Sequence, residues 1–331
     1  MTRSLTAARV TPALHRLVPV AVTAAVCGFV LQRVPLARLG QALASADYAW
    51  FLAFMVPNAL VFFCWDTLVL AVVIRWFHGS IRYRDLLPAR AGSYVVALAN
   101  TNLARAALAG YLARQLRQPV LQLGSSVIFL VLTEYTHLIA WATIGLMAGG
   151  SSAPRELLWV PSAVAGCWTI LLLYTRFGVR PTDVVRGLRR SVVWPRPSNG
   201  VRERQLLRTF RMAPLRRYAQ IIGLRAPMFF VSLCAHYYAA RAFDVHIPFT
   251  QLLAFLPVIF MVAALPITVA RLGTTQMAWI YFFSSYAPEA QLLAFSLAAH
   301  ATFAVSRAAI GLVFIPKVYA ELVLRGTRPA A

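Results

Sequence analysis

The chain has 331 residues, of which 60% are hydrophobic and only 13% are charged, and its mean hydropathy is +0.67. A water-soluble core cannot enclose this share of apolar side chains, so the composition excludes an ordinary soluble enzyme or binding module. Basic residues outnumber acidic ones 32 to 10. Because the arginines cluster between apolar stretches, we interpret the charge as a topology signal facing an anionic membrane leaflet, and we expect no nucleic-acid partner.

The N-terminal segment resembles a signal peptide, since three arginines precede the apolar run 17–31. No small-residue cleavage site precedes Gln32, so we predict a retained first membrane span. Removal of the segment as a signal peptide is the alternative.

Five further apolar stretches are close to or longer than the roughly 20 residues that cover about 30 Å of hydrocarbon as a helix. With the first run they predict six transmembrane helices, and therefore an all-α polytopic membrane protein. The five stretches are 49–74, 120–148, 157–174, 218–240 and 291–315.

Residues 87–112 are long enough to cross a membrane but too polar to face lipid, because they include Arg90, Asn100, Asn102 and Arg105. Polar groups of this kind at membrane depth are expected to face protein or water.

Residues 249–286 are apolar but interrupted by Pro257, Pro266 and the polar run 271–276. This pattern predicts two short helices around a non-helical tip.

The loop 175–217 contains twelve arginines and two acidic residues, which places it in the cytoplasm by the positive-inside rule. Both ends of 87–112 are then cytoplasmic, so this segment should enter the membrane and return, and 249–286 should do so from the opposite side. We therefore predict a single transmembrane domain, 1–331, in a bacterial inner membrane, with both termini cytoplasmic. Two opposed re-entrant hairpins suggest an inverted pseudo-repeat, as in many transporters.

Two groups of motifs resemble the signatures of the lysylphosphatidylglycerol synthase transmembrane-region family, which includes the flippase half of the bacterial multiple peptide resistance factor. The resemblance implies lipid translocation or a service to it, in cell-envelope biogenesis. The first group comprises Asn102-Leu103-Ala104-Arg105, Gly110-Tyr111-Leu112, Gly124-Ser125-Ser126-Val127 and Leu132-Thr133-Glu134; the second comprises the run from Leu265 to Gln276 and Pro288-Glu289-Ala290.

The chain departs from the family pattern at both signatures. It has Ala270-Arg271-Leu272-Gly273 and then Gln276 where the family usually has Gly-Gly-Leu-Gly and an acidic residue, and Tyr135 where an arginine commonly follows the acid of the first signature.

The polar residues of the two hairpins, with Glu134, are the predicted lipid-binding site. Arg105 and Arg271 would engage a lipid phosphate, because guanidinium groups pair well with phosphate oxygens. Pro266 and Gly273 would hold the broken backbone, and Asn102 and Gln276 would cap its freed groups.

Other ionisable residues within the predicted spans are Asp66, His137, Arg225, His236, His300 and Arg307. Charges in hydrocarbon are costly and often functional. The structural alternatives are that Arg225 extends to the cytoplasmic interface, that Arg307 pairs with a carboxylate such as Glu134, and that the histidines are hydrogen-bonded packing residues.

The ten acidic residues are scattered singly, and no nucleophile or phosphate-loop motif occurs, so we predict neither catalysis nor a cofactor. Glu134 and His137 have the spacing of half a di-iron site, but a hydrogen bond is the expected role and no metal is expected. The rival functions are a non-catalytic accessory subunit that recruits a cytoplasmic lipid or glycolipid synthase, and a membrane glycosyltransferase-type enzyme.

Overall fold

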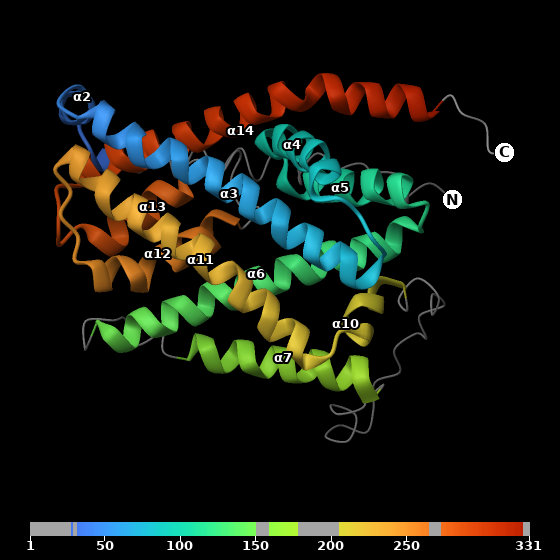
Figure 1. Ribbon diagram of the computed structural model, residues 1–331. Helices are drawn as coiled ribbons and strands as arrows, with labels where there is room; N and C mark the ends of the chain where they lie inside the picture. Colours follow the sequence, from blue (N-terminus) through green and yellow to red (C-terminus); the bar gives the residue numbers. More distant parts are fainter. Residues whose placement is uncertain (1–27, 29–31, 150–158, 178–204, 265–272, 327–331) are drawn as a thin grey trace, which may run out of the picture. The chain divides into compact units, whose positions relative to one another are not determined.

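The computed structural model describes residues 28, 32–149, 159–177, 205–264 and 273–326, and the regular structure of these residues is helical (Figure 1). Four of its helices are long and apolar enough to cross a membrane, which confirms the predicted helical membrane protein. Their apolar spans are Tyr48–Phe77 in α3 (Tyr48–Phe77), Val120–Ala148 in α6 (Val120–Ala148), Leu215–Phe243 in α11 (Leu215–Ala240) with the short helix η2 (Arg241–Phe243), and Glu289–Pro316 in α14 (Glu289–Gly326).

The two remaining predicted spans stay predictions. Apart from Gly28, residues 17–31 lie outside the described part of the chain. The stretch 157–174 corresponds to α7 (Val160–Phe177), whose apolar part, Pro161–Leu173, is shorter than the four long spans. The segment before α3 contains the helix α2 (Leu36–Ala44), in which leucines at positions 36, 39 and 43 share one face.

The polar segment 87–112 forms two helices that pack on each other, α4 (Tyr83–Ala99) and α5 (Thr101–Leu116). The break falls at Asn100, whose backbone is extended and whose side-chain oxygen accepts from the N–H groups of Asn102 and Leu103 at 2.8 and 3.0 Å. One asparagine therefore ends α4 and caps α5. The predicted helix–break–helix is present; its entry into a membrane remains a prediction.

The second interrupted segment also forms two packed helices, α12 (Phe249–Ala264) and α13 (Thr274–Phe283). Phe255 stacks on Phe282 with ring centroids 4.6 Å apart, which joins the pair. The expected interruption at Pro257 is wrong, because α12 continues through this residue. A single proline in an apolar helix is tolerated where neighbouring structure covers the freed carbonyl group.

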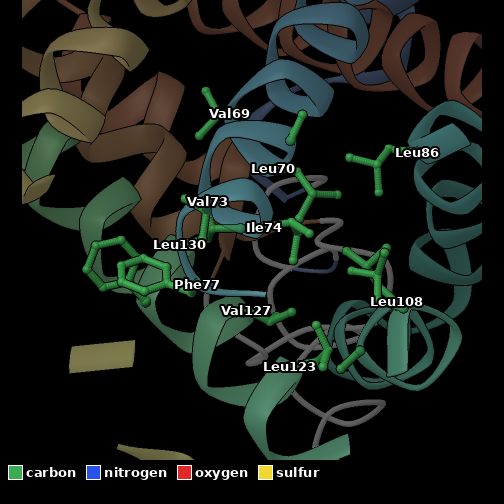
Figure 2. Close-up of a cluster of buried hydrophobic side chains, with 14 of the residues drawn as sticks. Val69, Leu70, Val73, Ile74, Phe77, Leu86, Leu108, Leu123, Val127 and Leu130 are labelled. Carbon is green, nitrogen blue, oxygen red and sulfur yellow. The ribbon is translucent and has the colours of Figure 1, made fainter. Parts of the chain in front are cut away.

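The chain divides into two compact units. Unit 1 comprises Met1–Leu60, Ile144–Gly149 and Val231–Ser306, and unit 2 comprises Val61–Thr143, Gly150–Phe230 and Arg307–Ala331. The core of unit 2 is apolar: Figure 2 shows side chains from α3, α4, α5 and α6 meeting in one cluster, among them Leu70, Ile74, Leu86, Leu108 and Leu123. The helical hairpin α4–α5 is thus fixed to α3 and α6 by buried apolar contacts.

Close helix approaches occur in both units where the sequence places glycine. A Cβ added at Gly145 of α6 would lie 2.4 Å from the backbone nitrogen of Ala254 in α12. One added at Gly311 of α14 would lie 2.1 Å from Cγ2 of Val95 in α4. Small residues at such crossings are a recurrent feature of helix packing in membranes.

Candidate functional site

Charged side chains from four helices meet inside unit 2. They are Asp66 of α3, Arg90 of α4, Glu134 of α6 and Arg225 of α11, and we name them the arginine–carboxylate cluster. The ranges of α3, α6 and α11 that supply three of them are among the candidate membrane spans. The cluster therefore places charged side chains within three of the candidate membrane spans.

Asp66 is the central acceptor of the cluster. Arg90 donates a hydrogen bond from Nη2 to Asp66 Oδ2. Arg225 Nη1 lies 3.8 Å from Asp66 Oδ1 and 4.0 Å from Glu134 Oε2, while its Nη2 donates to the carbonyl of Leu130 at 3.4 Å. Arg225 thus lies near two carboxylates, but neither is within hydrogen-bonding distance of it.

The two carboxylates differ in their access to the surroundings. The side chain of Asp66 is 7% exposed and that of Arg225 is 2% exposed, whereas that of Glu134 is 41% exposed. One acid is enclosed with the arginines, and the other lies at the open edge of the cluster.

Several donors of the cluster lack a hydrogen-bond acceptor among the described residues. They are Nε and Nη1 of Arg225, Nε of Arg90 and the hydroxyl of Tyr94. The ring centroid of Tyr94 lies 5.4 Å from the guanidinium group of Arg90 and 5.1 Å from that of Arg307. Buried donors without acceptors are costly, and a ligand with anionic oxygens would satisfy them.

The predicted site residues of the first hairpin are distributed differently from expectation. Glu134 joins the cluster, but Arg105 is half-buried on α5 and makes no ion pair with a carboxylate in the described part of the chain. Asn102 is exposed, and the expected capping role is wrong for its side chain, because Asn100 makes the cap. Both asparagines are near the break, and Asn100 is the capping residue because its backbone is extended.

In the second hairpin, Gly273 and Gln276 form the start of α13. Gly273 has φ +90°, a conformation that side chains disfavour, and Gln276 Oε1 accepts from its N–H at 2.7 Å. Gln276 therefore caps freed backbone, as expected. Pro266 and Arg271 lie outside the described residues.

One structural alternative raised by the sequence is wrong. Arg225 does not extend to an interface but is buried, and its Nη1 lies 4.0 Å from Glu134 Oε2. Its proximity to Asp66 and Glu134 depends on helices far apart in sequence. The available signal was that both acids and Arg225 occupy otherwise apolar spans.

A model of the family described as "Lysylphosphatidylglycerol synthase TM region" matches residues 16–311. The chain belongs to this family. Comparison with curated proteins gave no match, and comparison with solved structures gave none either. The lysylphosphatidylglycerol synthase transmembrane-region match spans the four long apolar helices nearly completely, so the chain is a multi-pass membrane protein of the flippase-like kind.

Residues of the first family signature also build a polar network at the end of α3. Nδ1 of His78 lies 2.6 Å from Oε1 of Gln118, and its Nε2 lies 2.7 Å from Oγ of Ser126. The same Ser126 Oγ lies 2.9 Å from Oγ1 of Thr209. Ser125 Oγ accepts from the N–H of Thr209, at the start of α10 (Arg208–Met212). The network ties the end of the basic loop to α6.

Burial lowers the pKa of His78 below its ordinary value of 6.5, with nearby Arg208 acting in the same direction and the Gln118 hydrogen bond opposing. Gln118 Nε2 donates to the carbonyl of His78, so its Oε1 is an acceptor and Nδ1 of the neutral ring is the donor. The network therefore uses an uncharged histidine.

Two histidines in membrane helices, His137 and His236, are packed against aromatic rings. His137 Nε2 accepts from the indole N–H of Trp141 at 3.0 Å, so the expected structural hydrogen bond is made to Trp141 and not to Glu134. His236 Nδ1 lies 2.7 Å from the carbonyl of Ser232, and its ring lies among Phe260, Trp279, Phe295 and Phe303. Among the described residues, no group of three or more potential ligands could hold a metal ion.

Proposed function

We propose that the protein binds the phosphate of an anionic phospholipid or polyprenyl-phosphate-linked glycolipid at the arginine–carboxylate cluster, and moves or presents this lipid between membrane leaflets. The observation that carries the proposal is Arg225, which is 2% exposed and has two side-chain nitrogens without a hydrogen-bond acceptor among the residues that the structure describes. Membership of the lysylphosphatidylglycerol synthase transmembrane-region family also supports this proposal.

A purely structural ion cluster would be expected to satisfy its donors, because buried charges are stable only when paired and hydrogen-bonded. Here the carboxylates lie 3.8 and 4.0 Å from Arg225 Nη1, too far for good hydrogen bonds. A phosphate has oxygens that a guanidinium group binds in a planar, two-point geometry. The partly exposed side chains of Arg90 and Glu134 offer an approach to this donor set.

The proposed setting is a bacterial inner membrane, with both termini and the basic loop 175–217 in the cytoplasm. The support is the distribution of arginine, of which this loop holds twelve. In this orientation α4–α5 and α12–α13 are re-entrant hairpins, and Arg105 and Arg271 are further phosphate contacts during passage. The role proposed is transport or presentation, without a covalent step.

The test is a leaflet-asymmetry assay in reconstituted vesicles that contain a labelled anionic lipid. The intact protein should move the label, and Arg225→Lys should reduce the rate strongly, because a lysine keeps the charge but loses the planar donor pair. Arg105→Ala and Arg271→Ala should reduce it to a smaller extent. Arg241→Ala is the matched control, since Arg241 is an exposed arginine of unit 1 that stacks on Tyr237.

Equal movement by the intact protein and by Arg225→Lys would contradict the proposed role of the cluster. Absence of movement by the intact protein, with phospholipid and polyprenyl-linked candidates tested, would favour the accessory function. Co-purification of a synthase that is lost when residues 175–217 are replaced would then support that function.

A further inference from the structure

We propose that Glu134 is an exchangeable counterion, whose carboxylate neutralises Arg225 in the empty site and is replaced there by the phosphodiester of the lipid. This inference rests on the proposed function and describes how the same site binds and releases its ligand.

The first argument is the asymmetry between the two acids. Asp66 is enclosed, accepts a hydrogen bond from Arg90 and lies 3.8 Å from Arg225. Glu134 lies 4.0 Å from Arg225, and its side chain is 41% exposed. Asp66 is therefore a fixed partner of the arginines, whereas the longer side chain of Glu134 can swing away without leaving a buried charge unpaired.

The second argument is charge balance. A carboxylate and a phosphodiester each carry one negative charge and two terminal oxygens, so their exchange leaves the charge beside Arg225 unchanged. A phosphate monoester carries about −1.5 to −2 at pH 7 and would add negative charge next to Asp66. The exchange therefore favours lipids whose phosphate is a diester.

The third argument is release. An arginine buried with unsatisfied donors would hold a phosphate tightly, and a transporter must also let its ligand go. A carboxylate that returns to Arg225 competes with the phosphate throughout the cycle. Glu134 would therefore weaken binding and accelerate dissociation, which is the opposite of what a direct ligand-binding residue does.

The experiment measures binding of three short-chain lipids to the full-length protein in neutral detergent, by native mass spectrometry and by tryptophan quenching. The probes are dihexanoylphosphatidylglycerol, a diester monoanion; dihexanoylphosphatidate, a monoester; and zwitterionic dihexanoylphosphatidylcholine. Glu134→Gln should bind the diester about fivefold more tightly than the unmodified protein, as expected when a partly exposed ion pair no longer competes. Its dissociation should be slower by a similar factor.

Glu289→Gln is the matched control, because Glu289 is a partly exposed acid of unit 1 paired with Arg33 at 3.6 Å. It should leave affinity and dissociation unchanged. Should Glu134→Gln unfold, Glu134→Asp provides the test: the shorter side chain keeps the charge but withdraws it from Arg225, so a smaller gain in affinity is expected.

The outcomes separate the two proposals. Failure of the unmodified protein to bind the diester more tightly than the zwitterion would overturn the proposed function. Diester binding that is unchanged or weakened in Glu134→Gln, and in Glu134→Asp, would overturn the counterion exchange alone. A preference of the unmodified protein for the monoester would also contradict the exchange, because it violates the charge balance.

Discussion

The arginine–carboxylate cluster of unit 2 and His236 of unit 1 show two different ways of burying polar side chains in apolar helices. In unit 2, Asp66, Arg90, Glu134 and Arg225 are brought together as ions that are incompletely satisfied. In unit 1, His236 is enclosed by aromatic rings and has a hydrogen bond to Ser232 of its own helix. A single imidazole ring is accommodated by packing, whereas a set of charged side chains requires partners from several helices. We therefore assign ligand binding to the charged interior and a packing role to the aromatic one.

The variant with the largest expected effect on stability is Arg225→Met, in unit 2. Removing the arginine leaves Asp66 and Glu134 with fewer positive partners, and loss of one member of a buried pair typically costs about 3 kcal/mol or more. We expect a large fall in thermal stability in detergent, together with loss of diester binding. Thermal unfolding followed by tryptophan fluorescence measures the first effect.

The matched change in unit 1 is His236→Leu, which removes one hydrogen bond and preserves an apolar ring environment. Its expected cost is about 1 kcal/mol. If both variants lost the same stability, the distinction between a charged and an aromatic interior would fail.

The next effect in size concerns helix packing in unit 1. Gly145→Ala places a methyl group 2.4 Å from the backbone of Ala254, which cannot move as a side chain can. Overpacking of this kind costs about 1–3 kcal/mol. Gly124→Ala on the same helix meets nothing within 4 Å, and should instead stabilise by about 0.5–1 kcal/mol. Denaturation in the same detergent should show a lower free energy of unfolding for Gly145→Ala and a higher one for Gly124→Ala. A decrease in both variants would contradict the close approach of α6 to α12.

A smaller effect is expected at the break in unit 2. Asn100→Ala removes the cap of α5 and should cost about 1 kcal/mol. Asn102→Ala should cost much less, because Asn102 contributes its backbone N–H to the cap and its side chain is exposed. Hydrogen exchange at the first turn of α5 should increase in Asn100→Ala only. Equal exchange in both variants would show that the cap is not made by Asn100.

The smallest effect is a pH dependence at the end of α3. Because the pKa of His78 in the folded protein is below its ordinary value of 6.5, the unfolded chain takes up the proton first as pH falls. Stability should therefore decrease below about pH 6.5 until the folded-state pKa is reached. His78→Gln should show a flatter dependence of thermal stability on pH over this range, and an identical slope would contradict the buried neutral histidine.

Hydrophobic patterning predicted the four long apolar helices. The bounds of α6 agree with the predicted stretch 120–148, because a mostly apolar run is bounded there by Pro119 and by Gly149. The interruption at Pro257 was wrong, since sequence alone does not show which neighbours cover a freed carbonyl group. Capping by Gln276 follows from its position three residues after Gly273.

The membership of the arginine–carboxylate cluster, the proposed binding site, could be predicted only in part. Glu134 was singled out from a motif, and Asp66 and Arg225 from their location in apolar spans, but their pairing requires the packing of α3, α6 and α11. Arg90 was noted only as a polar residue in a long segment. Its bond to Asp66 depends on how α4 packs on α3, which no periodicity reports.

The most direct test of the account is photo-crosslinking with a phosphatidylglycerol that carries a diazirine in its headgroup, in vesicles containing the full-length protein. We predict labelled peptides from α6 and α11 around Glu134 and Arg225, with labelling strongly reduced in Arg225→Lys and unchanged in Arg241→Ala. Labelling confined to other helices, or equally strong in Arg225→Lys, would contradict the assignment of the buried arginine as the phosphate-binding residue.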